Sequence, residues 1–241
     1  MIAPLKNPTY ARLFAAQVVA LLGTGLTTVA LALLAYDLAG EKAGTVLGTA
    51  LALKMIAYVT IAPVVVGLAA ALPRKPLLVG LDLARAAMVG CLPFVTELWQ
   101  IYALVFLMQA ASAGFTPTFQ ATIPDILPDE RTYMRALSLS RLAYDLEALL
   151  SPTLAAAALL FLSFDALFAG NAVAFLVSAA LVLTAALPRS ARGEDGGRSA
   201  LGKIGFGIRA YLATPRLRGV LALSLSAAAA GAMVIVNTVL L

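Results

Sequence analysis

Seven long apolar runs, separated by short polar gaps, occupy most of this chain. Their approximate bounds are 13–38, 45–72, 77–95, 101–123, 136–162, 166–187 and 220–241. Each run meets the roughly 20 apolar residues that a helix needs to cross a bilayer core of about 30 Å. With 62% hydrophobic and 12% charged residues, a soluble domain would expose apolar surface to water over most of its area. The sequence therefore predicts an all-α integral membrane protein in a lipid bilayer.

Lysine and arginine gather in every second gap between these runs. The basic residues of the first three such gaps are Lys6, Arg12, Arg74, Lys75, Arg131 and Arg135. The gap between the sixth and seventh runs holds seven more, whereas the alternate gaps carry Lys42 among acidic residues. The positive-inside rule then places the N-terminus and the basic gaps in the cytoplasm of a multi-pass protein of the inner (plasma) membrane.

One gap is much longer than the others and is rich in arginine and glycine. It predicts three regions: 1–187, a six-helix transmembrane domain; 188–218, a basic cytoplasmic loop; and 219–241, a seventh transmembrane helix. We expect the seventh helix to begin a second half.

Composition excludes several function classes. Cys91, placed by the pattern in the middle of the third run, is the only cysteine, and histidine is absent. A thiolate metal site or a catalytic histidine cannot be built from these residues, so we expect no metal, no cofactor and no enzyme activity. The basic residues are spread over separate loops, which argues against a nucleic-acid partner.

Two apolar runs carry polar residues at helical spacing. The first has Gln17, Thr24 and Thr28, and the fourth has Gln109, Ser112, Thr116 and Gln120. At 100° per residue each set forms one narrow stripe, which must face a helix partner or an aqueous cavity rather than lipid. Hydrogen bonds between helices of a closed bundle would explain either stripe alone. The pair of similar stripes favours a shared polar cavity.

Charged residues also lie inside two runs. Lys54 is about ten residues into the second run, and Arg141, Asp145 and Glu147 lie in the fifth. Arg141 and Asp145 are at i, i+4 and can neutralise one another, whereas Glu147 points elsewhere and needs another partner. Lys54 is the cation of comparable depth. Two interpretations stay open: a static buried ion pair, or a role in proton or substrate coupling.

Short motifs recur at the ends of the runs. The first run opens with Asn7-Pro-Thr-Tyr-Ala-Arg-Leu-Phe14, and the third contains Asp82-Leu-Ala-Arg85. The fourth contains Phe115-Thr-Pro-Thr-Phe119 and closes with Ile123-Pro-Asp-Ile-Leu-Pro128. Together they resemble the major facilitator superfamily, most closely its drug:proton antiporter branch. Residues 50–58 and 136–152 further resemble a nickel-resistance subgroup of exporters.

The superfamily's loop motif after the second helix is matched in part. The corresponding segment, 66–75, carries Ala70 where the motif has an acidic residue that helps to latch the two halves together. The resemblance therefore implies a latch that rests on Asp82 and Arg85, or a weaker one. The loop-motif residues are Gly67, Arg74, Lys75, Asp82 and Arg85.

The resemblance implies an alternating-access carrier with two six-helix halves, in which the first and fourth helices line a midplane cavity. We expect a proton-coupled exporter of a small solute, either a drug-like compound or a divalent cation. Because these residues comprise one half and one further helix, we expect a partial reading frame whose second half follows in cis. A homodimer is the alternative arrangement, and a non-transporting membrane fragment or assembly partner is the alternative function.

Overall fold

The computed structural model describes residues 3–69 and 72–188, together with short pieces between 213 and 226. The chain divides into two units, 1–194 and 195–241, and the description below concerns the first. Most of the predicted basic loop and of the predicted seventh helix lies outside the described residues.

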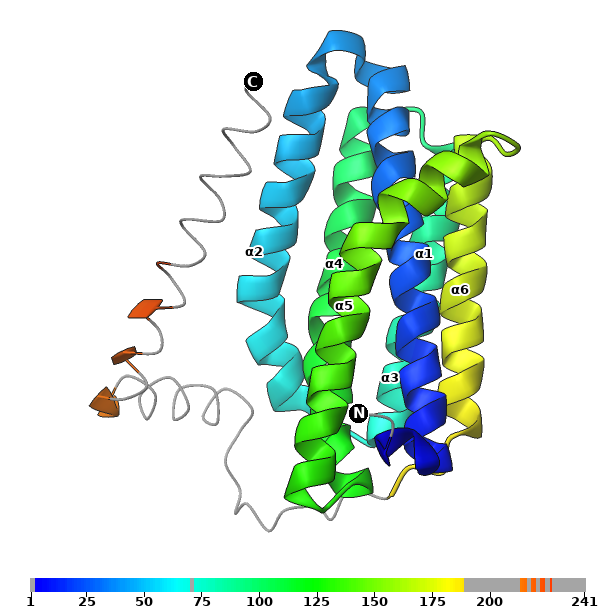
Figure 1. Ribbon diagram of the computed structural model, residues 1–241. Helices are drawn as coiled ribbons and strands as arrows, with labels where there is room; N and C mark the ends of the chain where they lie inside the picture. Colours follow the sequence, from blue (N-terminus) through cyan, green and yellow to red (C-terminus); the bar gives the residue numbers. More distant parts are fainter. Residues whose placement is uncertain are drawn as a thin grey trace. The chain divides into compact units, whose positions relative to one another are not determined.

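The described part of the first unit is helical throughout. Its helices are α1 (Pro8–Ala39), α2 (Ala43–Ala69), α3 (Arg74–Cys91), α4 (Leu98–Ile126), α5 (Glu130–Leu159) and α6 (Phe164–Thr184), with 3-10 turns η1 (Ala3–Lys6), η2 (Gly40–Lys42) and η3 (Leu92–Phe94). They run side by side along one direction (Figure 1). No strand occurs in residues 3–69 or 72–188, so the all-α prediction is confirmed for them.

Five helical stretches within the described residues are long and apolar enough to cross a membrane. The first of them, Pro8–Ile61, contains α1 and most of α2. Gly40 ends α1 with a φ of 55°, a conformation that glycine adopts without steric cost, and the chain turns back there (Figure 1). The stretch is therefore two helices, and the count of six spans followed by a seventh stays a prediction.

Polar side chains begin several helices. Asn7 Oδ1 accepts hydrogen bonds from the backbone amides of Thr9 and Tyr10, at 2.9 and 3.2 Å. Asp129 accepts from the amide and the hydroxyl of Thr132 at the start of α5, and these bonds hold the pKa of Asp129 below its usual value. At the other end of a helix, Cys91 is the last residue of α3 and is exposed, which corrects its predicted place in mid-span.

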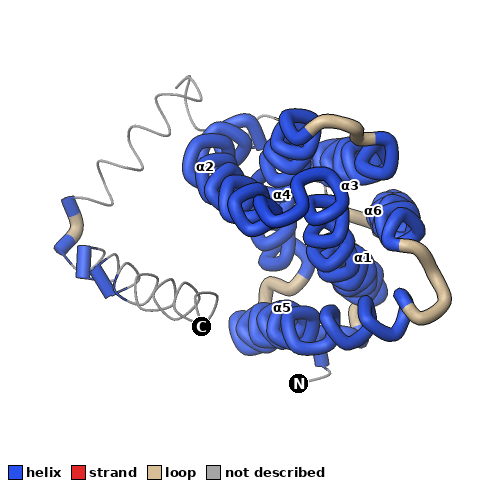
Figure 2. The backbone as a smooth tube through the Cα atoms, turned by 90° about the horizontal axis from the view of Figure 1, so that it is seen from above, coloured by secondary structure: helices blue, strands red, loops and turns tan. Residues whose placement is uncertain are grey.

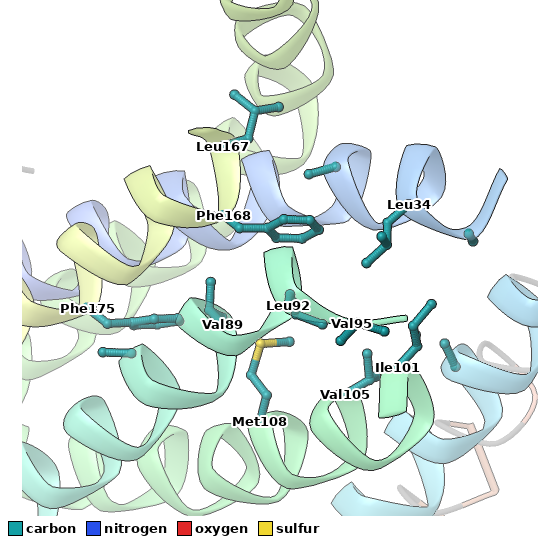
Figure 3. Close-up of a cluster of buried hydrophobic side chains, with 14 of the residues drawn as sticks. Leu34, Val89, Leu92, Val95, Ile101, Val105, Met108, Leu167, Phe168 and Phe175 are labelled. Atoms are coloured by element: carbon teal, nitrogen blue, oxygen red, sulfur yellow. The ribbon is translucent and has the colours of Figure 1, made fainter. Parts of the chain in front are cut away.

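Two apolar clusters form the interior of the bundle. One lies toward the end where α1 finishes and includes Leu34, Val89, Ile101, Phe168 and Phe175 (Figure 3). The other lies where α1 begins and contains, among others, Tyr10, Leu13, Leu78, Phe119 and Val182. The helices α1, α3, α4 and α6 contribute residues to both clusters.

The outer helices α2 and α5 are attached differently. α2 packs mainly on α4, and α5 packs mainly on α1, with little contact between α5 and either α4 or α6. Figure 2 shows α2 and α5 on either side of α4 and α1. Residues of α5 are exposed along most of its length. α2 and α5 are therefore attached to the bundle through different helices, α4 and α1.

Basic residues close one end of the bundle. Arg12 Nη1 donates to the Thr184 carbonyl at 2.7 Å, and Lys75 Nζ donates to the Ala185 carbonyl at 3.0 Å. These are carbonyls at the C-terminal end of α6, which lack partners within the helix and carry its negative dipole end. The same basic residues that predict a cytoplasmic location therefore also fix α1 and α3 to α6.

Two glycines let α1 approach its neighbours closely. A Cβ at Gly23 would lie 2.8 Å from the Ala174 Cβ of α6, and a Cβ at Gly25 would overlap the Ser151 side chain of α5 and lie 2.6 Å from Glu147 Oε1. Small residues at such contacts allow the backbones of membrane helices to pack together.

We expect Gly25→Ala to destabilise the bundle by about 1–3 kcal/mol, because the added methyl group must push α5 away from α1. Unfolding in detergent measures the change. Gly170→Ala is the matched control, since a Cβ at Gly170 of α6 meets no atom within 4 Å. The control should be neutral or stabilising by up to about 1 kcal/mol. Equal effects of the two substitutions would contradict the close α1–α5 contact.

Candidate functional site

The polar stripe of α4 is only partly buried. Gln109, Ser112 and Thr116 are half-buried and Gln120 is exposed. Ser112 Oγ donates to the Met108 carbonyl at 3.0 Å, and Thr116 Oγ1 to the Ser112 carbonyl at 3.4 Å. Each hydroxyl proton is thereby used within the helix, which leaves the oxygen lone pairs as acceptors for another group.

The stripe of α1 divides into two parts. Thr24 is half-buried and Thr28 is exposed, and both hydroxyls donate to carbonyls four residues earlier. Gln17 differs: it is 4% exposed, and its Oε1 accepts a 3.0 Å hydrogen bond from Ser140 Oγ of α5. The structure therefore corrects the expectation that Gln17 lines a cavity. Its amide bridges α1 and α5 in the interior.

Lys54 and Glu147 belong to the two outer helices. Each lies near the middle of its helix and is half-buried. Glu147 Oε1 accepts from Ser151 Oγ at 3.3 Å. The two charges are not among the ion pairs in contact within the described residues.

Two tyrosines occupy the neighbouring helical turn. Tyr58 follows Lys54 at i+4 and Tyr144 precedes Glu147 at i−3, so each tyrosine shares a helix face with one of the charges. Tyr58 and Tyr144 are both half-buried. The opposite directions of these offsets match antiparallel helices. Sequence reasoning missed both tyrosines, although their spacing from Lys54 and Glu147 was visible.

We call the half-buried polar residues near the middle of α2, α4 and α5 the polar face. Its members are Lys54, Tyr58, Ser112, Thr116, Tyr144 and Glu147.

Other predicted residues lie outside the polar face. Arg141 Nε is 3.1 Å from Asp145 Oδ1, and the two side chains are 79% and 53% exposed. Such an exposed pair contributes little to stability. The described residues contain no group of three His, Cys, Asp or Glu side chains that could hold a metal ion.

A model of the Major Facilitator Superfamily matches residues 13–241. The matched range covers nearly the whole chain and includes all the residues of the polar face. The chain belongs to the major facilitator superfamily. This membership agrees with the long apolar helices described above.

A curated sequence relative matches less of the chain. An uncharacterized MFS-type transporter, YfiS, of Bacillus subtilis strain 168 is 30% identical over 118 residues. The alignment takes in 49% of this chain and 28% of the relative. This chain therefore spans much less than two thirds of the length of that relative.

The superfamily's loop motif holds α3 and α4 together at the end where α1 begins. Arg74 forms an ion pair with Asp125 and also donates to the Ala121 carbonyl, while Lys75 caps α6 as described above. Gly67 lies within the last turns of α2. The basic positions of this superfamily motif thus have partners inside the first unit.

Asp82 and Arg85 are also engaged inside the first unit. Asp82 is fully buried, pairs with Arg85 and accepts a 2.7 Å hydrogen bond from Ser178 Oγ of α6. The Arg85 guanidinium lies 4.1 Å from the centroid of the Phe115 ring and 4.5 Å from that of Phe175. The two charges are thus paired with each other on α3, beside α4 and α6, and a latch between two halves that rests on them stays a prediction.

Proposed function

We propose that this chain forms the first half of an alternating-access secondary transporter, in which the polar face contacts the solute. The observation that carries the proposal is the presence of half-buried polar and charged side chains at mid-helix on α2, α4 and α5. Such residues are costly in a bilayer unless they face a water-filled pathway or a partner. Superfamily membership supports a transport role for that pathway.

Proton-coupled export is the mode we propose. Glu147 supplies a carboxylate that can take up a proton, and Lys54 is the cation of the polar face. A group that binds either a proton or a solute couples their movements in opposite directions. The static ion-pair alternative is less favoured, because the two groups are not in contact.

An organic solute, as in the drug:proton antiporter branch, is better supported than a divalent cation of the kind handled by a nickel-resistance exporter. Glu147 is the one carboxylate of the polar face, and the chain contains no histidine. Divalent cations of this type are usually held by several imidazole, thiolate or carboxylate ligands. We therefore propose a small organic compound.

This chain, reconstituted in liposomes together with the second half of the transporter, tests this function. We expect a pH difference across the membrane to drive solute movement. We also expect added solute to move protons across the membrane, which a pH-sensitive dye trapped inside the liposomes reports. Protein-free liposomes are the control. Absence of solute-dependent proton movement across a panel of cationic, anionic, zwitterionic and neutral organic solutes would contradict the proposal.

The proposed orientation has its own test. We expect the N-terminus and the loop of residues 189–218 to be cytoplasmic and the η2 turn to be external in the cell inner membrane. In a Cys91→Ser background, an impermeant maleimide added to intact cells should label Lys42→Cys and leave Gly196→Cys unlabelled. Permeabilised cells control for reactivity at both positions. Labelling of Gly196→Cys in intact cells would reverse the topology.

A further inference from the structure

An apolar groove of 390 Å³ runs between α1 and α5. It is lined by residues between 14 and 22 of α1 and between 139 and 150 of α5, and its surface is almost entirely carbon. Among the lining leucines, Leu142, Leu146 and Leu150 are 41%, 45% and 48% exposed. A row of large apolar side chains is thus left uncovered along α5.

The one charged residue of this lining does not make the groove polar. Glu147 lies near the end of the groove that is farther from the start of α5. Its Oε1 accepts from Ser151 Oγ at 3.3 Å and lies 2.6 Å from the place that a Cβ of Gly25 would take. The carboxylate is therefore held toward α1 by Ser151, which is 3% exposed.

The groove follows the helix axes over the depth of one membrane leaflet. Tyr10 bonds to the Ala136 carbonyl and Gln17 to Ser140, each at 3.0 Å, so α1 and α5 run in the same direction side by side. At 1.5 Å per residue the lining spans about 12 Å on α1 and about 16 Å on α5. Half of a bilayer's hydrocarbon core is about 15 Å. The groove therefore has the direction and the length of one acyl chain.

Basic residues lie at the end of the groove where both helices begin. Arg135 is one turn before Leu139 on α5 and about 40° from it around the helix, and Arg131 is one turn farther. Both arginines are exposed, and neither has a hydrogen bond or ion pair with a residue that the structure describes. The η1 turn, which ends at the exposed Lys6, also contacts α5. This end of the groove thus offers cations to an anionic group.

The acidic residues at the start of α5 leave these arginines available. Asp129 precedes the helix, and its Oδ2 accepts from both the amide and the hydroxyl of Thr132. Glu130 lies about 140° from Arg135 around the helix, on a different face. The face that continues the groove is therefore basic first and apolar beyond.

We propose that this groove binds one anionic phospholipid, of the phosphatidylglycerol class. An acyl chain fills the groove, and Arg131 and Arg135 hold the phosphate through charge-assisted hydrogen bonds. Basic sites beside transmembrane helices recognise anionic headgroups in this way. A protein helix in the groove would cover the leucines but would leave the two arginines without a counter-charge. The site is separate from the proposed transport function and would make a lipid part of the α1–α5 contact.

Photo-crosslinking tests the site. The chain is reconstituted together with the second half of the transporter in phosphatidylcholine liposomes. These contain phosphatidylglycerol or phosphatidylcholine with the same diazirine-bearing acyl chain, and mass spectrometry locates the crosslinks. We expect the phosphatidylglycerol probe to label the groove residues at least about fivefold more, the effect of one arginine near an anionic headgroup. Val173 and Leu176, exposed on α6, should be labelled equally by both probes.

Charge variants identify the headgroup site. Arg131→Gln combined with Arg135→Gln should remove the preference for phosphatidylglycerol at the groove. Arg131→Lys combined with Arg135→Lys should keep most of it, because an ammonium also attracts phosphate. Arg141→Gln is the matched control, since Arg141 is an exposed arginine of α5 already paired with Asp145 at 3.1 Å. This control should leave the preference unchanged.

Three results would overturn the inference. Equal labelling of the groove by both probes would mean that apolar surface alone attracts the acyl chains. No labelling of the groove by either probe would mean that protein, such as the second half of the transporter, covers it. A preference that survives the double glutamine variant would place the phosphate away from Arg131 and Arg135.

Discussion

Replacing Arg85 by methionine should destabilise the bundle by about 3–5 kcal/mol, the largest stability effect expected in this chain. The substitution keeps the apolar volume between Phe115 and Phe175 but strands the fully buried Asp82 carboxylate. Breaking a buried pair by removing one partner costs this much because an uncompensated charge remains. Unfolding in detergent, followed by circular dichroism, measures the loss.

Two further variants separate charge from packing. Arg141→Met removes the cation of the exposed pair with Asp145 and should cost no more than about 1 kcal/mol. Adding Asp82→Asn to Arg85→Met should restore part of the stability, since the stranded charge is then gone. If Arg85→Met and Arg141→Met cost the same, the buried ion pair does not hold α3, α4 and α6 together.

Glu147→Gln should abolish proton movement coupled to solute, down to the level of protein-free liposomes. Glutamine keeps the size of the side chain and its bond to Ser151, but it cannot carry a proton. Exchange of labelled for unlabelled solute without a pH gradient should persist if any solute still binds. Proton release in the variant at the wild-type rate would exclude Glu147 from coupling.

The partner residue completes the test. Lys54→Ala should likewise leave the fold intact while removing proton-driven transport, and full transport by this variant would reject a coupling role for Lys54. In stability, Lys54→Met and Glu147→Gln should be non-additive by about 0.5–3 kcal/mol if the charges interact across α2 and α5. Strict additivity would reject the pair.

The helices were largely predictable from sequence because a bilayer imposes its length on each apolar run. The predicted run 101–123 lies within α4, and Asn7 and Asp129 begin helices as capping residues commonly do. The last predicted run lies outside the described residues. Helix ends were predicted less well, as Cys91 at the end of α3 illustrates, because hydropathy does not mark where backbone hydrogen bonds stop.

The site was predictable only in part, because periodicity defines a face of a helix but not the neighbour of that face. Gln17 shares a stripe with Thr24 and Thr28, yet α5 approaches α1 at Gln17 and the side chain is buried against Ser140. Asp82, paired with Arg85, likewise accepts a hydrogen bond from Ser178 of α6, and nothing local in the sequence indicates this partner.

Water accessibility of α4 tests most directly whether the polar face lines a transport pathway. In a Cys91→Ser background, Ser112→Cys replaces a half-buried hydroxyl at mid-helix, and Val173→Cys places a thiol on an exposed apolar position of α6. We expect a charged, water-soluble methanethiosulfonate to modify Ser112→Cys in liposomes and to leave Val173→Cys unmodified. Equal resistance of the two thiols, or modification of Val173→Cys alone, would contradict a water-filled pathway along α4.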